Sequence, residues 1–354
     1  MTDRLRIACI GAGYFSRFHR DGWAALPRAE AAGVADPDLA AAQATGLPAH
    51  ASAEALLDAL GPDLSDVVLD IAAPPAAHAP LIRLGLAAGL RAILCQKPFC
   101  GDLALAETVA AEAEAAGTPL LVHENVRFQP WYRTLRAALD AGEIGTLRNL
   151  TFRLRPGDGQ GPRAYLDRQP YFQTMPRFLV HETAIHWIDT FRYLVGEPEA
   201  VFADLRRLNP AIAGEDAGHI LFRLPGGARA LFDGNRLLDH AAADRRRTLG
   251  EALIEGDAGA LTLGGDGAVH LRRFGETAPR RIAPPPPAEA GFGGGCATAF
   301  QAHALAVLLD GEAPETSARL YLRNLRLEAA IYASAEAGRW LAPDGTPIHP
   351  NSNA

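Results

Sequence analysis

Three ionisable residues, Glu182, His186 and Asp189, lie in one short stretch whose spacing suits acid–base chemistry. On a helix, residues separated by four and by three positions are neighbours, so we expect these side chains on one helix face. A carboxylate beside an imidazole orients the ring and raises its basicity, as general acid–base catalysis requires. His181 and His186 lie about 140° apart around a helix, so the spacing does not match a zinc-protease motif. The alternative is a structural polar network.

Lys97 supplies a second candidate charge, at the end of an apolar run over residues 92–95. The residue after it is Pro98, which biases Lys97 toward an extended conformation and keeps the strand from continuing into a helix. We therefore expect Lys97 at the carboxyl end of a strand, which is the edge where open α/β sheets bind ligands. An ammonium group there could stabilise a developing alkoxide. Lys-Pro pairs are also common in surface turns, so the surrounding order of motifs has to decide.

A glycine-rich segment follows the first predicted strand and opens a helix, the context in which this pattern indicates a dinucleotide site. Gly11 would make the tight turn, and Gly13 would let backbone N–H groups approach a pyrophosphate at the helix N-terminus. The third position of the motif is Ser16, which is small enough for close packing of helix on strand. The alternative is that the two glycines only shape a strand-to-helix turn.

Asp36 ends the second predicted strand, close to the offset of about 20 residues expected for a ribose-binding carboxylate. It would accept hydrogen bonds from ribose hydroxyls and repel a 2′-phosphate, which favours NAD over NADP. Alternatively, Asp36 starts a turn or caps the helix that follows. The residues that we expect to contact the cofactor are Gly11, Gly13, Tyr14, Phe15, Asp36, Ala73, Pro74, Gln96, Lys97 and Asn125.

The scaffold for these residues is predicted by the alternation of apolar runs and alanine-rich helical segments over residues 1–123. Continuous apolar runs suit parallel strands covered on both faces, and strands separated by helices imply βαβ units. We therefore predict a Rossmann-type domain with a doubly wound parallel sheet. The apolar runs lie at 5–10, 29–35, 67–71, 92–95 and 120–123, with a weaker one near Ala49.

The rhythm changes from residue 124 onward. A strand candidate at 147–154 is followed by a long polar loop that reaches Arg177, and from 200 to 273 strand candidates succeed one another with glycine-rich turns. Strands without intervening helices indicate an antiparallel or mixed sheet. We predict an α+β domain over residues 124–354 with a large open-faced sheet. Its helices are expected at 131–141, 180–195, 298–309 and 318–337.

Over nearly the whole chain, the order of motifs resembles the Gfo/Idh/MocA family of sugar and polyol oxidoreductases. The resemblance is carried by the early Gly-x-Gly, the Lys-Pro pair, the helix ending His-x-x-Asp, and segments 123–128 and 142–147. It implies that Lys97 and His186 serve the substrate, with Glu182 in place of the family's aspartate. Gln96 stands where the family usually has glutamate. Either Lys97 or His186 would then accept the hydroxyl proton.

These observations predict an NAD-dependent dehydrogenase acting on the CH–OH group of a sugar, polyol or related cyclic alcohol. Lys97 and the pair Glu182 and His186 would handle the hydroxyl proton and the alkoxide. Two alternatives stay open: a sugar lyase or epimerase that retains its cofactor, and an NAD-binding regulator without turnover. Substrate contacts are expected from Lys97, Arg127, Arg163, Tyr165, Glu182 and His186.

The bulk properties of the 354-residue chain exclude several partner classes. Hydrophobic residues make up 48% and charged ones 21%, as in ordinary globular proteins, and the net charge of −7 argues against nucleic acid or an anionic membrane. No uninterrupted apolar run approaches the roughly 18 residues that span a bilayer. The four cysteines lack metal-type spacing, which indicates reduced thiols, no metal and a cytoplasmic location. The open sheet face predicts a homodimer or homotetramer formed through the C-terminal sheet.

Overall fold

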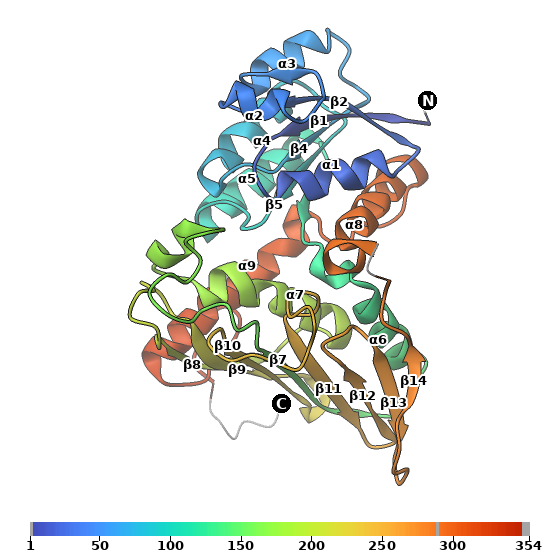
Figure 1. Ribbon diagram of the computed structural model, residues 1–354, viewed down its shortest axis with the longest axis vertical. Coiled ribbons are helices and arrows are strands. Elements are labelled where there is room, and N and C mark those ends of the chain that lie inside the picture. Colours follow the sequence, from blue (N-terminus) through green and yellow to red (C-terminus); the bar gives the residue numbers. More distant parts are fainter. Residues whose placement is uncertain (1–2, 288–289, 349–354) are drawn as a thin grey trace. The chain divides into compact units, whose positions relative to one another are not determined.

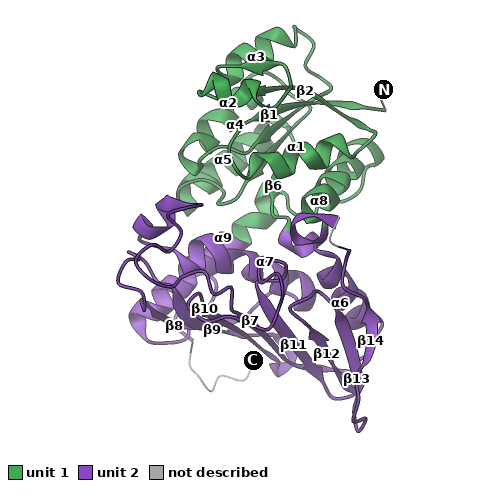
Figure 2. Ribbon diagram, in the orientation of Figure 1, with its two compact units in different colours: residues 1–125, 295–323 green, residues 126–294, 324–354 purple. Residues whose placement is uncertain are grey.

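The computed structural model describes residues 3–287 and 290–348 and divides the chain into two compact units (Figure 2). Unit 1 comprises Met1–Asn125 and Gly295–Arg323, and unit 2 comprises Val126–Gly294 and Asn324–Ala354. The first crossing lies close to the boundary predicted after residue 123. The return of Gly295–Arg323 to unit 1 was not predicted, because nothing in a helical pattern says which sheet the helix will cover.

In unit 1 the described residues form a six-stranded parallel sheet of order β3-β2-β1-β4-β5-β6 (Figure 1). The predicted doubly wound sheet is confirmed. The strand order reverses between β1 and β4, and ligands of such sheets bind at the carboxyl ends of the strands near this point. The strands are β1 (Leu5–Ile10), β2 (Ala29–Ala35), β3 (Ala49–His50), β4 (Val67–Ile71), β5 (Ala92–Gln96) and β6 (Leu120–His123).

Helices cover both faces of this sheet. Right-handed crossovers place α1 and α2 on one face and α4 and α5 on the other. Helix α1 packs against α8, so the segment that returns late in the chain completes this layer. The helices are α1 (Ser16–Ala24), α2 (Leu39–Gln43), α3 (Ala53–Ala59), α4 (His78–Ala87), α5 (Leu103–Ala116) and α8 (Cys296–Leu305).

One helical segment among the described residues, Phe292–Asp310, is long and apolar enough to cross a membrane by length and composition alone. Most of this segment, including α8, belongs to unit 1. Phe300 and Gln301 are fully buried, and the Gln301 amide donates to the backbone oxygen of His19 at 2.9 Å. The apolar composition of α8 is thus explained by its packing on α1.

In unit 2 the described residues form an eight-stranded sheet of order β14-β13-β12-β11-β7-β10-β9-β8. Strands β7 and β10 pair in parallel and the other neighbours are antiparallel, so the predicted mixed sheet is confirmed. The strands are β7 (Leu147–Leu154), β8 (Ala200–Arg206), β9 (Ala217–Arg223), β10 (Arg229–Asn235), β11 (Gly250–Gly256), β12 (Gly259–Leu263), β13 (Val269–Arg273) and β14 (Arg280–Ala283). The helices are α6 (Pro130–Asp140), α7 (Ile185–Val195) and the larger part of α9 (Ala318–Ala337), which begins in unit 1.

Aromatic contacts hold α7 on this sheet. The ring of Trp187 stacks on Phe152 of β7 with centroids 4.4 Å apart and lies 5.7 Å from Phe232 of β10. Its indole N–H donates to the hydroxyl of Tyr132 on α6 at 2.9 Å. Buried aromatic rings pack in specific geometries, so these contacts fix the rotation of α7 and with it the position of the neighbouring His186.

Candidate active-site residues

The two glycines of the turn between β1 and α1 have different roles. Gly11 has a φ of +102°, and a Cβ there would lie 2.4 Å from the backbone oxygen of Ala72, so only glycine fits. A Cβ on Gly13 would meet no described atom within 4 Å. Ser16 closes the turn in place of the motif's third glycine, because its hydroxyl donates to the Gly13 oxygen at 2.7 Å. The turn is therefore tight against β4 and open where a pyrophosphate would approach.

Asp36 holds the same turn from the end of β2. One carboxylate oxygen accepts the N–H of Ala12 at 2.8 Å, and the other accepts the N–H of Asp38 at 2.8 Å. Helix α2 is capped by Asp38, whose side chain accepts the N–H groups of Ala40 and Ala41. The alternative that Asp36 caps this helix is therefore wrong. Asp36 does accept backbone N–H groups from the glycine-rich turn and from the turn that follows β2. Its half-buried carboxylate lies at the glycine-rich turn, where a ribose carboxylate is required.

The other predicted cofactor contacts in this part of unit 1 flank the turn. Tyr14 is 41% exposed, with the guanidinium of Arg17 4.6 Å from its ring centroid. Phe15 immediately precedes α1, and its ring lies edge-on to His19, 5.7 Å away. Contact of these two rings with a cofactor stays a prediction.

His78 connects the loop after β4 with Pro98, the residue that follows Lys97. Its Nε2 lies 2.8 Å from the backbone oxygen of Ala73, and its Nδ1 lies 3.1 Å from that of Pro98. Burial outweighs these carbonyl contacts and lowers the pKa of His78, so at pH 7 the ring is neutral and has one N–H to donate. His78 thus holds Ala73 and Pro74, both predicted cofactor contacts, near the residues that follow β5.

Gln96 and Lys97 stand at the carboxyl end of β5, as predicted. Lys97 is half-buried, and the Lys97–Pro98 peptide bond is cis. The side-chain oxygen of Gln96 accepts the backbone N–H of Lys97 at 2.7 Å, and its nitrogen lies 3.2 Å from Nε2 of His19. Gln96 is thus buried behind the lysine.

Asn125, the last predicted cofactor contact, is also buried. Its amide donates to the sulfur of Cys296 at 2.8 Å. Burial raises the pKa of Cys296 to about 12, so this thiol stays protonated. The structure shows this packing role, and a cofactor contact of Asn125 stays a prediction.

In unit 2, Glu182 lies in a π-helical segment, Leu179–Ala184, that continues into α7. We predicted that the side chains of Glu182 and His186 are neighbours because they are four residues apart on an α-helix. A π turn inserts an extra residue into that spacing. At the N-terminus of this segment, the carboxylate of Glu215 accepts the N–H of Val180 at 3.0 Å. Glu182 and His186 are both half-buried.

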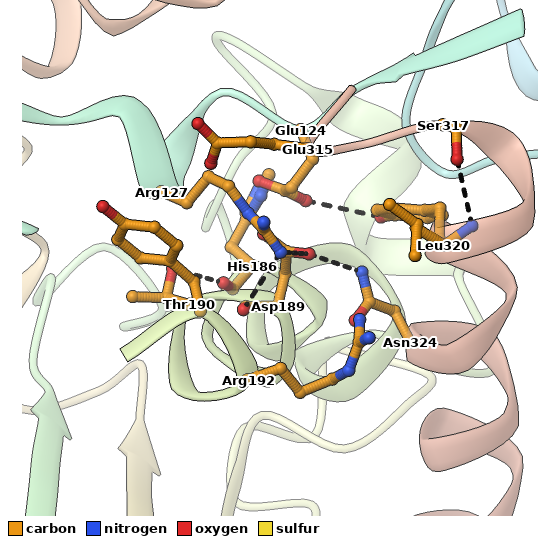
Figure 3. A network of polar contacts seen from close by, with 12 residues as sticks. Glu124, Arg127, His186, Asp189, Thr190, Arg192, Glu315, Ser317, Leu320 and Asn324 are labelled. Atoms are coloured by element: carbon orange, nitrogen blue, oxygen red, sulfur yellow. Dashed lines mark hydrogen bonds and ion pairs between the residues drawn. The ribbon is translucent and has the colours of Figure 1, made fainter. Parts of the chain in front are cut away.

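Asp189, which the spacing grouped with these two residues, belongs to a buried network (Figure 3). It is 1% exposed, and each of its carboxylate oxygens accepts one N–H of Arg127 at 2.6 Å. Asn324 donates to Asp189 at 2.8 Å, and Arg192 donates to the oxygen of Asn324. A two-pronged charged pair of this kind is a strong positional restraint. The structure therefore shows a bracing role for Arg127, while its predicted substrate contact stays a prediction.

The polar loop between β7 and the π-helical segment folds around a small core of its own. Tyr165, Phe172 and Phe178 pack there with Ala164 and Ile212. The sequence predicted a long polar loop here, and these apolar side chains bury enough surface to order it. Arg163 lies outside the core in an exposed ion pair with Asp167.

Arg236, just after β10, anchors this loop. It is 4% exposed, and its guanidinium donates to the Tyr165 hydroxyl at 2.7 Å and to Asp158 at 2.8 Å. It also donates to the hydroxyl of Thr183, next to Glu182. Burial raises the pKa of Tyr165, so its hydroxyl remains a neutral donor within this network. A substrate contact by Tyr165 stays a prediction.

Tyr171 marks the surroundings of Glu182. Burial first, and then the negative charge of Glu182, raise the pKa of Tyr171 to about 12. Half of Tyr171 is exposed, and its hydroxyl accepts a hydrogen bond from the side-chain nitrogen of Gln169 at 3.1 Å. Tyr171 was not among the residues predicted to contact the substrate.

Other residues were missed altogether, namely His19, Asp70 and Arg236. For Asp70 there was a usable signal, because it is the charged residue in the otherwise apolar run 67–71. Buried charges in strands are paired or hydrogen-bonded. For Arg236 there was no comparable local signal, since arginine after a strand is common on surfaces.

Together, the parallel sheet, its glycine-rich turn and Asp36 define a dinucleotide-binding domain of the Rossmann type. A family model described as an NAD-binding Rossmann-fold oxidoreductase family matches residues 5–124, and one described as the GFO/IDH/MocA C-terminal domain matches residues 132–262. The chain belongs to the Gfo/Idh/MocA family, and it is an NAD-dependent dehydrogenase acting on CH–OH groups.

Curated relatives share most of the chain. A D-apiose dehydrogenase from Paraburkholderia graminis is 36% identical over 351 residues, covering 96% of this chain and 89% of that one. An inositol 2-dehydrogenase from Rhizobium meliloti is 28% identical over 239 residues, covering 66% of this chain and 69% of that one.

A solved structure shows the same architecture. An oxidoreductase from Agrobacterium radiobacter, in complex with NAD+, L-tartaric acid and magnesium, matches with a TM-score of 0.85 and 26% identity. The match covers 96% of this chain and 98% of that one. In the present chain, no group of three or more His, Cys, Asp or Glu among the described residues could hold a metal ion.

Proposed function

We propose that the protein transfers a hydride from the CH–OH group of a sugar, polyol or related cyclic alcohol to NAD. The observation that carries the proposal is Lys97 at the carboxyl end of β5, in the sheet whose β1 and β2 end at the glycine-rich turn and Asp36. Ligands of open α/β sheets bind at this edge.

The residues of unit 1 suit NAD. Gly13 leaves room for the pyrophosphate at the N-terminus of α1, and Asp36 would accept the ribose hydroxyls. NAD supplies the hydride acceptor when it is bound. The carboxylate of Asp36 would repel a 2′-phosphate, so NADP is the weaker cofactor.

Lys97, His186 and Glu182 are proposed to act on the substrate. The ammonium of Lys97 would bind the hydroxyl oxygen and stabilise the alkoxide as the C–H bond breaks. The hydroxyl proton passes to Lys97 or to His186, with Glu182 orienting the imidazole. The carbon is oxidised by two electrons, which leave with the hydride, and one proton is released.

The substrate class is supported by the names of the relatives, which act on D-apiose and on inositol. Both are polyhydroxylated, and the loop of unit 2 presents several hydrogen-bonding side chains. We propose Arg127, Arg163 and Tyr165 as substrate contacts, together with Tyr171, whose pKa is raised by burial and by the negative charge of Glu182.

Absorbance of NADH tests the function directly. Purified protein is mixed with NAD or NADP and a panel of D-apiose, other aldoses, inositols, other polyols and L-tartrate. Net NADH formation supports a dehydrogenase. Conversion of a sugar without net NADH indicates the lyase or epimerase, and NAD binding without any conversion across the panel indicates the regulator.

Substitution of Lys97 tests its assignment. Lys97→Ala should lower kcat by about 10³-fold, the order expected when a charge-stabilising group is removed. The dissociation constant of NAD should stay within a few-fold of wild type, measured by isothermal titration. Arg83→Ala is the control, because this exposed residue of α4 pairs with Glu112 on the surface. Near-normal turnover of Lys97→Ala would remove Lys97 from the catalytic residues.

We also propose a cytoplasmic location and a homodimer or homotetramer formed through the C-terminal sheet. The four cysteines are buried and form no disulfide, in keeping with a reducing compartment. Cell fractionation tests the location. Analytical ultracentrifugation of the purified chain measures the oligomeric state, and a monomer at micromolar concentration contradicts the proposal.

A further inference from the structure

A chain of hydrogen bonds in unit 1 leads from a buried aspartate to the backbone of Lys97. Both carboxylate oxygens of Asp70, on β4, lie within 3.0 Å of Nδ1 of His19, and Trp23 donates to one of them at 2.6 Å. On the other side of the imidazole, Nε2 lies 3.2 Å from the side-chain nitrogen of Gln96. The side-chain oxygen of Gln96 accepts the Lys97 N–H at 2.7 Å. Asp70 and His19 are 1% exposed, and Gln96 is 7% exposed.

The backbone N–H of Lys97 determines which groups donate and which accept in this series of hydrogen bonds. A backbone N–H can only donate, so the oxygen of Gln96 must face it and the amide NH2 must face His19. An NH2 group needs an acceptor, so Nε2 of His19 carries the lone pair. The ring proton must then be on Nδ1, where Asp70 accepts it. One fixed donor thereby assigns both the amide orientation and the histidine tautomer.

The state of Asp70 matters for this assignment, because an ionised carboxyl group accepts hydrogen bonds with both of its oxygens. Burial alone would raise the pKa of Asp70, but its interaction with the His19 ring and the Trp23 hydrogen bond outweigh burial, so its pKa is lowered and it is a carboxylate. His123 stacks on His19 with ring centroids 3.9 Å apart. Burial holds the pKa of His123 well below its usual value, so this second ring is neutral. The buried thiol of Cys9 also stays protonated, since burial raises its pKa.

We propose that Asp70, His19 and Gln96 form a positioning unit that sets the backbone, and hence the side chain, of Lys97. The same unit explains glutamine at position 96. A glutamate there would turn a carboxylate toward the lone pair of Nε2, and the two would repel unless His19 took up a second proton. The proposal rests on the catalytic role assigned to Lys97, but the hydrogen-bond chain itself can be tested without turnover.

The first experiment measures the tautomer of His19 by NMR of 15N-histidine-labelled protein, with the resonances assigned by their loss in His19→Phe. In the wild type we expect a neutral ring with its proton on Nδ1. In Gln96→Glu, a substitution of nearly equal size, we expect both ring nitrogens to be protonated at the same pH. A proton on Nε2 in the wild type, or an unchanged ring in Gln96→Glu, would overturn the assignment.

The second experiment measures kcat and NAD affinity for Gln96→Met, His19→Phe and the double variant. Gln96→Met releases the Lys97 N–H, and a misplaced catalytic group lowers kcat by about 10- to 100-fold. NAD affinity should stay within a few-fold. Because His19 acts through Gln96, the double variant should lose no more than Gln96→Met alone. Losses that multiply, or a Gln96→Met variant with normal kcat, would contradict the positioning role.

The two experiments separate this proposal from the proposed function. If the protein oxidises none of the panel substrates, the tautomer measurement still decides the hydrogen-bond chain. If Gln96→Glu does not fold, the wild-type tautomer and the Gln96→Met kinetics remain. If Lys97→Ala keeps its activity while the tautomer is as expected, the catalytic assignment fails and the hydrogen-bond chain stands as a structural one.

Discussion

Two buried aspartates, Asp70 in unit 1 and Asp189 in unit 2, are each 1% exposed and yet have different partners. Asp189 meets a guanidinium, because both of its oxygens accept N–H groups of Arg127. Asp70 instead faces the imidazole of His19 and the indole N–H of Trp23, and with the tautomer proposed above neither partner carries a charge.

The difference decides what each carboxylate can control. A guanidinium only donates and is always charged, so the pair of Asp189 and Arg127 is neutral overall and braces α7. An imidazole has a second ring nitrogen whose state depends on the first. Through it, Asp70 acts on Gln96 and then on Lys97. A buried carboxylate thus restrains its own surroundings when it faces arginine, and orients a distant group when it faces histidine.

The largest effect expected from this comparison is on stability. Asp189→Ala should lower the free energy of unfolding by about 3–5 kcal/mol, because it breaks a buried ion pair and leaves the charge of Arg127 uncompensated. Asp70→Ala leaves neutral donors unpaired and should cost less, about 1–3 kcal/mol for each buried donor that finds no water. Urea denaturation followed by circular dichroism and by tryptophan fluorescence measures both.

The matched substitutions make the outcome decisive. An equal loss in the two variants, or a larger loss in Asp70→Ala, would show that partner charge does not distinguish the two aspartates. Asp189→Asn is the control for volume, since it keeps the side-chain size and removes the charge.

A smaller effect on the free energy of unfolding is expected from the protonation of His123, whose ring stacks on His19. Its pKa in the folded state is held well below 6.5, chiefly by burial, so only the unfolded chain takes up a proton as the pH falls through 6.5. Stability is therefore lost toward acid. His123→Phe removes this loss and should stabilise the protein by up to about 2 kcal/mol at pH 5, with little change at pH 8. Thermal melts at both pH values measure it, and an equal shift at pH 5 and pH 8 would contradict the neutral buried ring.

The smallest effect is expected at the exposed ion pair of Arg163 and Asp167, whose side chains are 74% and 85% exposed. Arg163→Ala should change the unfolding free energy by less than about 0.5 kcal/mol, since water screens such pairs. The same variant sharpens the assignment of the substrate loop. A raised KM with unchanged stability would support the proposed substrate contact, whereas an unchanged KM would remove Arg163 from it.

Much of the fold was predictable because its signals are local. The strands at 5–10, 29–35 and 67–71 were predicted with the bounds that the structure shows, since continuous apolar runs flanked by turn residues indicate buried parallel strands. The π-helical turn at Leu179–Ala184 was not predictable, because its sequence has the same apolar periodicity as an α-helix. The spacing argument for Glu182 and His186 depended on that regularity.

The residues of the candidate site also divide into those with a local sequence signal and those without one. Gly11 and Asp36 were recognisable from their position after a strand, because a tight turn at that place requires glycine and a ribose requires an acceptor. Arg127 and Tyr165 were chosen by residue type alone. The structure instead shows Arg127 paired with Asp189, and the Tyr165 hydroxyl bonded to Arg236 and Asp158.

By itself, the sequence determined the order of elements, the class of cofactor and the lysine at a strand end, because each depends on residues that are close in the chain. Only the tertiary structure decided what holds that lysine. His19 is 51 residues from Asp70 and 77 from Gln96, and these residues meet only because parallel strands bring their carboxyl ends and one helix face together. Hydrogen bonds form between atoms within about 3 Å, whatever their distance along the chain, so the tautomer of His19 and the reason for glutamine at position 96 could be read only from the folded molecule.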